Sequence, residues 1–135
     1  MQISTKSRYG LRSMIYLAQK KKICSAKEIA REERIPLRYL EKIMSKLKKA
    51  GLVRVKRGAG GGYFLAFLPN KIKIGQIIKT LEGTMALVFC LDKRPKNNIF
   101  CPKQKGCVSK IVWQKIQRAI ISTLNSLTLA DLIKK

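Results

Sequence analysis

Apolar residues near the start of the chain recur at the three- and four-residue steps of amphipathic helices. This spacing predicts a first helix from Ser4 or Thr5 to about Lys20, with one apolar face. Ser25 followed by Glu28 has the spacing of a capping box, which predicts a short second helix directly behind it.

The stretch from Ile35 to Gly51 has the same helical spacing and an outward face that is mostly basic. Pro36 suits the first position of a helix, and Gly51 suits the left-handed position that follows a helix end. Two helices joined by a short turn, the second polar and basic outward, are typical of a helix-turn-helix. A plain helical hairpin with a solvated face has the same pattern, so this stretch alone leaves both interpretations open.

The residues that follow favour the helix-turn-helix. Residues 52–57 alternate apolar and basic side chains, which predicts a half-buried strand, and residues 63–67 form a second strand rich in aromatics. The glycine-rich residues 58–62 between them predict a flexible reversal. A phosphate-cradling loop is disfavoured there, because neither Lys-Ser, Lys-Thr nor a helix follows the glycines. Helices followed by a β-hairpin with a glycine tip predict a winged helix that touches DNA.

The C-terminal half contains two further helical patterns, separated by a segment without periodicity. Residues 72–81 predict a short helix, and residues 112–127 predict a long one with an apolar face. Since the long helix lies outside the compact core, we expect its apolar face to pair with the same helix of a second subunit. A capped helical turn should follow at 128–133, with Leu132 and Ile133 packed back onto the protein.

The predicted fold class is therefore mainly α with a small β-hairpin, a winged helix-turn-helix with a long C-terminal dimerisation helix. We expect a winged helix-turn-helix DNA-binding domain at 1–83, a cysteine-containing sensor loop at 84–108, and the dimerisation helix and C-terminal turn at 109–135.

The charge supports a polyanionic partner. The 135 residues include 30 Lys and Arg against 7 Asp and Glu, a net charge of +23. Residues 1–68 have a net charge of +13 and residues 69–135 one of +10, so the charge is not confined to a tail. No apolar run approaches the roughly 20 residues of a membrane span, and the basic start resembles no secretory signal. With no histidine, paired carboxylates or nucleotide fingerprint, we expect neither an enzyme nor a small-molecule substrate.

Three of the four cysteines gather in the segment without periodicity. Cys90, Cys101 and Cys107 have the spacing C-x10-C-x5-C, while Cys24 lies alone between the first two helices. Clustered thiols in a reducing compartment indicate metal or redox chemistry. The spacing matches neither structural zinc sites nor the common ferredoxin patterns, so incidental loop thiols stay open as an alternative. Nearby basic residues favour the thiolate form; they are Lys93, Arg94, Lys96, Lys103 and Lys105.

Several motifs together resemble one bacterial family, the winged-helix regulators that include IscR, NsrR and CymR. The resemblance covers almost the whole chain. Its motifs are Ser4-Thr5-Lys6-Ser7-Arg8-Tyr9, Tyr39-Leu40-Glu41, Gly51-Leu52-Val53, Arg57-Gly58-Ala59-Gly60-Gly61-Gly62-Tyr63 and Leu127-Thr128-Leu129-Ala130-Asp131-Leu132. It implies a bacterial cytoplasmic homodimer that regulates transcription, most simply as a repressor, by binding pseudo-palindromic double-stranded promoter DNA.

The same resemblance implies a cofactor. Many members hold an iron–sulfur cluster on three cysteines, and the state of the cluster sets DNA affinity. This puts Cys90, Cys101 and Cys107 on the ligand positions, with [2Fe–2S] favoured over [4Fe–4S]. Where members supply a histidine or an acidic residue as a further ligand, this chain has Lys110, Arg8 and Arg12. The fourth ligand stays open among Asp92, Glu82, Cys24, a partner carboxylate, and an exogenous thiol or water.

The family also places the third helix in the major groove of DNA. Arg38 and Glu41 are then the expected base readers, since arginine can bind guanine and a carboxylate can accept from cytosine. The remaining residues would contact phosphates or, at the wing, the minor groove. They are Lys6, Arg8, Tyr39, Lys42, Lys46, Arg57, Gly60 and Gly61.

Two other readings remain. A regulator of the same family without a cluster would respond to thiol oxidation or to a partner protein. A non-specific basic nucleic-acid-binding protein would use the bulk charge without a sensor, and its binding would depend steeply on salt without sequence preference.

Overall fold

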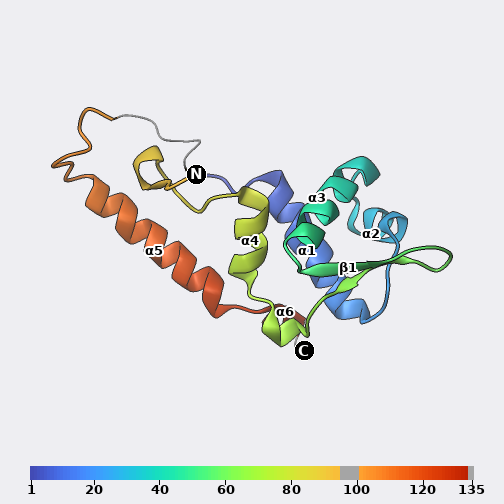
Figure 1. The fold of residues 1–135 in the computed structure, drawn as a ribbon. Helices are drawn as coiled ribbons and strands as arrows, with labels where there is room; N and C mark the ends of the chain where they lie inside the picture. The colour runs from blue at the N-terminus through green and yellow to red at the C-terminus, as the bar shows by residue number, and fades with distance from the viewer. Residues whose placement is uncertain (95–100, 134–135) are drawn as a thin grey trace.

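The computed structural model describes residues 1–94 and 101–133, and it has the predicted winged-helix order (Figure 1). Three helices come first and an antiparallel hairpin follows, so the mainly α fold class with a small β-hairpin is confirmed. The elements are α1 (Thr5–Lys20), α2 (Ala26–Glu33), α3 (Leu37–Lys49), β1 (Val53–Lys56) and β2 (Gly62–Leu65).

Local capping explains where the first helices begin. The hydroxyls of Ser4 and Ser25 accept hydrogen bonds from the backbone N–H groups of Ser7 and Glu28, at 3.1 and 3.0 Å. The capping box predicted at Ser25 is half formed, because the Glu28 carboxylate accepts from Tyr16 Oη at 2.6 Å. Pro36 was predicted at the first helical position of α3, but it is the N-cap, and the helix begins one residue later at Leu37.

The C-terminal half adds helices around the winged helix. They are η1 (Pro69–Lys71), α4 (Ile74–Glu82), η2 (Phe89–Leu91), α5 (Lys110–Ser126) and α6 (Leu129–Ile133). The predicted helix at 72–81 thus begins two residues late, since Ile72 follows η1 and is buried against the core. In the terminal turn Leu129 is fully buried and Ile133 packs on the core, whereas Leu132 is 41 % exposed, so the packing expected of Leu132 was wrong.

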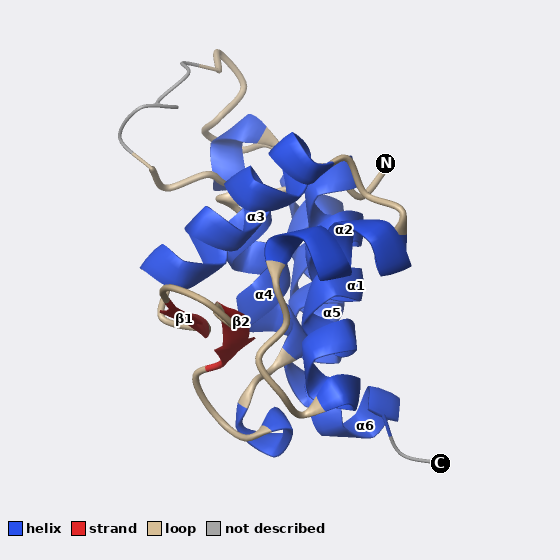
Figure 2. Cartoon of the chain, turned by 90° about the vertical axis from the view of Figure 1, so that its right-hand side faces the viewer, coloured by secondary structure: helices blue, strands red, loops and turns tan. Residues whose placement is uncertain are grey.

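One hydrophobic core unites α1 to α4, the hairpin and α6. Its largest fully buried side chains come from every one of the first three helices and from α4 and α6; they include Met14, Ile29, Leu40, Met44, Ile77 and Leu129. Viewed from the side of the wing, the molecule is mostly helical, and the two strands occupy a small part of it (Figure 2). Among the described residues, no helix is both long and apolar enough to cross a bilayer.

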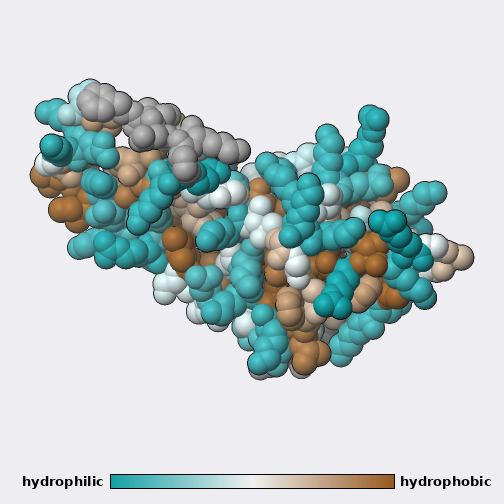
Figure 3. Space-filling model, in the orientation of Figure 1, coloured by the Kyte–Doolittle hydropathy of each residue, from teal (hydrophilic) through white to brown (hydrophobic). Residues whose placement is uncertain are grey.

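The helix α5 stands apart from this core. It packs on α4, and in Figure 1 it lies at the opposite end of the molecule from the wing. None of its residues is buried in the single chain, and Ile111, Val112 and Trp113 are 52, 49 and 38 % exposed. Hydrophobic side chains at this end interrupt a mostly hydrophilic surface (Figure 3). An amphipathic helix without buried residues leaves an apolar face open.

Candidate nucleic-acid interface and cysteine loop

The helix α3 presents a polar, mostly basic face to solvent. Four apolar side chains anchor its other face in the core, namely Leu40, Ile43, Met44 and Leu47. Six polar residues of its outward face are all exposed; they are Arg38, Glu41, Lys42, Ser45, Lys46 and Lys49. Anchoring on one side and free side chains on the other are what a helix that enters a DNA groove requires.

Two of the predicted phosphate contacts lie side by side. Lys6 near the start of α1 and Lys46 near the end of α3 face each other, and the neighbouring charge of Lys6 lowers the pKa of Lys46. Within the described residues no salt bridge engages either lysine. The two lysines are 40 positions apart in the sequence, but the fold brings their ammonium groups together. The pair forms a site that favours an anion such as a phosphate.

The aromatic pair Tyr9–Tyr39 joins α1 to the start of α3. The rings meet edge to face at 5.6 Å between centroids, and the Arg12 guanidinium lies 5.5 Å from the Tyr9 ring. Arg12 also binds the carboxylate and the carbonyl oxygen of Glu33 at the end of α2. Tyr39, predicted to contact phosphate, is half-buried in this contact, so its ring also fixes the first turn of α3. Arg8 of α1, one helical turn before Arg12, is exposed.

Glycines shape the wing tip where a side chain has no room. The Gly61 N–H donates to the Gly58 carbonyl at 3.0 Å, and a Cβ on Gly61 would clash with the backbone oxygen of Lys56. Gly60 has a φ of +72° and open space around it, so it is free to approach a ligand. Exposed cations lie on the β1 side of the tip, where Lys56 and Arg57 follow the exposed Arg54 of β1.

The sequence interpretation missed Arg54 and Lys56 as candidate phosphate contacts. The signal was present, because a strand that alternates apolar and basic residues places all its basic residues on one face. Val53 and Val55 point toward the core while Arg54 and Lys56 are exposed, as the alternation requires. The basic surface thus extends along β1 beyond Arg57.

The wing is fixed to the body by backbone hydrogen bonds to the α1–α2 loop. Cys24 and Tyr63 exchange two of them, at 2.9 and 2.8 Å. The Cys24 thiol is fully buried, and burial raises its pKa to about 11. Burial also raises the pKa of Tyr63, and the nearby Glu41 carboxylate adds to the effect. Glu41 therefore lies where α3 meets the wing.

The other three cysteines lie in the loop that leads into α5. Cys90 belongs to η2, Cys101 is exposed, and Cys107 lies three residues before α5. The Ser109 hydroxyl, 3.1 Å from the Cys107 sulfur, and the backbone at Lys110 lower the pKa of Cys107. The thiolate-favouring effect predicted for the loop cations thus comes, at Cys107, mainly from hydrogen bonds at the start of a helix. Arg94 pairs with Asp92 instead, and Lys96 lies outside the described residues.

The described conformation does not assemble a ligand set. Over residues 1–94 and 101–133, no three Cys, Asp or Glu side chains come close enough to hold a metal ion. Of the fourth-ligand candidates, Cys24 is buried beneath the wing, Glu82 accepts from the Ser4 N–H at 3.3 Å, and the Asp92 carboxylate accepts from Arg94 at 2.8 Å. Three thiols match the chemistry of iron–sulfur ligation, but their arrangement here does not fit a preformed site.

A winged helix with a basic recognition surface defines a class of protein, the winged-helix DNA-binding regulators. Residues 3–135 match the family model Rrf2, described as iron-dependent transcriptional regulator. The chain belongs to the Rrf2 family of bacterial transcriptional regulators, which confirms the family resemblance read from the sequence.

Individual relatives match over nearly the full chain. The HTH-type transcriptional regulator CymR of Bacillus subtilis is 41 % identical over 98 % of this chain and 89 % of its own. The solved structure titled CymR, the global cysteine regulator of B. subtilis, has a TM-score of 0.80 at 37 % identity, covering 98 % of this chain and 96 % of the other. The structure of T. potens IscR has a TM-score of 0.78 at 38 % identity, covering 98 % and 86 %.

Proposed function

We propose that this protein is a homodimeric, sequence-specific regulator that represses transcription from bacterial promoters in the cytoplasm. One observation carries the DNA-binding part. Lys6 and Lys46, which no salt bridge engages within the described residues, lie together beside the exposed face of α3. In this proposal α3 enters the major groove, with Arg38 and Glu41 reading bases. Lys6, Arg8, Tyr39, Lys42 and Lys46 contact phosphates, and the wing contributes Arg57, Gly60 and Gly61 at the minor groove.

The role of Glu41 is testable because it is acidic on a face meant for a polyanion. A carboxylate there weakens phosphate attraction, so its use is reading a cytosine N4 donor. Glu41→Ala should relax specificity at one base pair by about 1–3 kcal/mol and leave other positions unchanged, as measured by binding to a set of single-base variants of a selected site. Uniform weakening or tightening at every site would overturn the assignment.

The dimer is proposed to form through the apolar face of α5. Two recognition helices then meet half-sites about one helical turn, or a multiple of it, apart. Because the cysteine loop leads directly into α5, a chemical change in the loop can alter the relative placement of the two α3 helices. The affinity for a paired site would then change more than the affinity for a half-site.

The signal is proposed to act through an iron–sulfur cluster on Cys90, Cys101 and Cys107, with [2Fe–2S] favoured. When bound, the cluster would supply a centre sensitive to iron, nitric oxide or oxidants. In the described conformation these thiols are not grouped, so cluster binding requires the loop to rearrange. Anaerobic purification, a visible spectrum and an iron and sulfide assay test this directly. A colourless, iron-free protein after reconstitution would overturn the cluster and leave DNA binding untouched.

A cluster-free, thiol-controlled regulator is the second candidate, and a specific observation favours it. The described residues bring no three potential ligands together for a metal ion, and the lowered pKa of Cys107 favours its reactive thiolate. The CymR relative is titled a global cysteine regulator. If oxidation of iron-free protein changes DNA affinity and replacing Cys107 by serine abolishes the change, this candidate replaces the cluster.

A further inference from the structure

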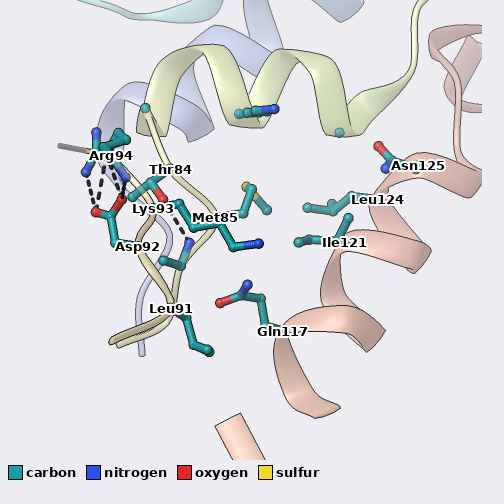
Figure 4. A pocket seen from close by; sticks show the side chains of 14 residues that line it. Thr84, Met85, Leu91, Asp92, Lys93, Arg94, Gln117, Ile121, Leu124 and Asn125 are labelled. Atoms are coloured by element: carbon teal, nitrogen blue, oxygen red, sulfur yellow. Dashed lines mark hydrogen bonds and ion pairs between the residues drawn. The ribbon is translucent and has the colours of Figure 1, made fainter. Parts of the chain in front are cut away.

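A cavity of about 590 Å³ lies where α5 meets the winged-helix domain. Its walls are α4, α5 and the loop residues 83–94 (Figure 4). A volume of this size is within the usual range of small-molecule sites. The proposed functions above assign no role to it.

The two helices that form the cavity meet at the start of α4. Gly75, at the start of α4, lies against the Asn125 side chain of α5, so that a Cβ on Gly75 would clash with the Asn125 carboxamide. Beside this contact the Ile74 N–H donates to the Leu127 carbonyl at 2.9 Å. At the other end of α4 the loop residues lie between the two helices (Figure 4). The cavity is therefore a wedge whose narrow end is the Gly75–Asn125 contact.

The polar groups of the wedge favour an anion. Lys79 of α4 and Lys93 of the loop line it, and no salt bridge engages either lysine in the described parts of the chain. Figure 4 shows the Lys93 side chain reaching from the loop toward the space between α4 and α5. The third cation, Arg94, is bound to Asp92 at 2.8 Å and is thereby neutralised.

Gln117 of α5 adds a directed donor. Its side-chain oxygen already accepts a hydrogen bond from the Leu87 N–H at 3.0 Å. The carboxamide NH2 group is the part of this side chain that can donate to a ligand. Apolar side chains complete the lining, with Met85 from the loop and Ile121 and Leu124 from α5. Two ammonium groups, one amide donor and an apolar floor match a short-chain organic anion.

We propose that this wedge binds a small organic anion with a short apolar chain, such as a monocarboxylate, and that the ligand acts as an effector. Its carboxylate lies between Lys79 and Lys93, and its chain lies on Met85, Ile121 and Leu124. A ligand in the wedge holds α4 and α5 at one separation, which sets the direction in which α5 leaves the winged-helix domain. The effect on DNA affinity rests on the proposed dimeric function, whereas the binding itself does not.

Binding is tested first without DNA, using hexanoate as the probe on the full chain. Two-dimensional NMR at constant ionic strength should show shifts of the Gln117 and Asn125 side-chain amides with added hexanoate. Hexan-1-ol and inorganic phosphate, which carry only the chain or only the charge, should bind at least about tenfold more weakly. Equal binding of either probe, or shifts centred on the exposed Phe67 and Leu68 instead, would overturn the site.

Variants then identify the cations. Lys93→Met and Lys79→Met should each weaken hexanoate binding at least about tenfold, and Lys93→Arg should restore most of it. Lys71→Met, which removes an exposed lysine from η1 outside the cavity, should change nothing. Unchanged binding in both cavity variants would overturn the proposal.

The last arm adds DNA. Saturating hexanoate should change the affinity of the wild-type protein for a paired site at least about threefold, and this change should be absent in Lys93→Met. If hexanoate binds at the wedge but DNA affinity stays constant, the effector role is wrong and the site stands. If the wild-type protein binds no DNA sequence selectively, the proposed function fails while the binding result is unaffected.

Discussion

Lys6 and Lys46 link charge to function at the scale of single residues. The nearby charge of Lys6 lowers the pKa of Lys46, which means that the folded chain holds this proton less readily than the unfolded chain. The repulsion therefore destabilises the folded state at neutral pH, and it is relieved as pH rises through the lowered pKa of Lys46. The repulsion between the two lysines lowers the stability of the free protein, and an anion bound between them would offset this loss.

Replacing Lys46 by methionine should therefore change stability and DNA binding in opposite directions. We expect the free energy of unfolding at pH 7 to rise by about 0.3 kcal/mol, a small value because Lys46 is exposed. The slope of log affinity against log salt should fall in magnitude by about one phosphate contact. Urea unfolding and DNA titrations measure the two effects. Lys48→Met is the control, and a Lys46→Met protein that is both less stable and equally salt-dependent would contradict the assignment.

The four cysteines should differ sharply in reactivity. The pKa of Cys24 is raised to about 11 and its thiol is buried, so it stays protonated and protected at pH 7. Hydrogen bonding from Ser109 lowers the pKa of Cys107, so Cys107 should be alkylated fastest by iodoacetamide in the iron-free protein. Peptide mass spectrometry after short exposures measures this order.

Ser109→Ala provides the matched test of that cause. Removing the hydroxyl should raise the pKa of Cys107 and slow its alkylation at pH 7, while the rate at Cys101 stays the same. Rapid labelling of Cys24 under native conditions would show that the wing detaches from the α1–α2 loop.

At the scale of elements, the sequence predicts best those features whose cause is local. Ser4, Ser25 and Gly51 mark helix ends because each acts on backbone groups within three residues of itself. Glu28 was assigned to a capping box, but its carboxylate binds Tyr16 Oη twelve residues away. That contact depends on how α1 crosses α2, which no local spacing records.

In the candidate site, too, some features have a local cause that the sequence predicts, and others depend on contacts between distant residues. The exposed face of α3 follows from helical periodicity, and the basic face of β1 follows from strand alternation. The Lys6–Lys46 pair and the wedge at Gly75 and Asn125 arise from residues 40 and 50 positions apart. The burial of Leu129 in place of Leu132 likewise depends on the backbone bond from Leu129 N–H to the Ile72 carbonyl.

The prediction that the protein dimerises depends on the exposed apolar face of α5. Ile120 lies on the face expected to pair, and a glutamate there would bury a charge in the interface. Losing one isoleucine from each subunit removes about 3–6 kcal/mol of apolar burial, so Ile120→Glu should weaken the dimer at least about 100-fold. Sedimentation equilibrium measures the change. Arg118→Glu, on the opposite side of α5, should leave the dimer intact, and equal effects of both would contradict pairing through this face.

At the scale of the whole molecule, the net charge of +23 is divided between the N-terminal and C-terminal halves of the chain, which form different surfaces. Residues 1–68 have a net charge of +13 and form the surface around α3 and the wing. Residues 69–135 have a net charge of +10, and their cations include those of the cavity lining, the cysteine loop and α5. If only the first region meets DNA, the charges of the second add long-range attraction but no phosphate contacts.

A pair of matched arginines can separate these two contributions. Arg54 on β1 and Arg118 on α5 are both exposed, so glutamine at either position removes one charge without disturbing the core. Each neutralised phosphate contributes about 0.9 to the slope of log affinity against log salt. Arg54→Gln should therefore reduce that slope by about one in each subunit, whereas Arg118→Gln should leave it unchanged and lower only the association rate at low salt. Equal slopes for the two variants would mean that DNA wraps along α5, as expected of a non-specific basic binder.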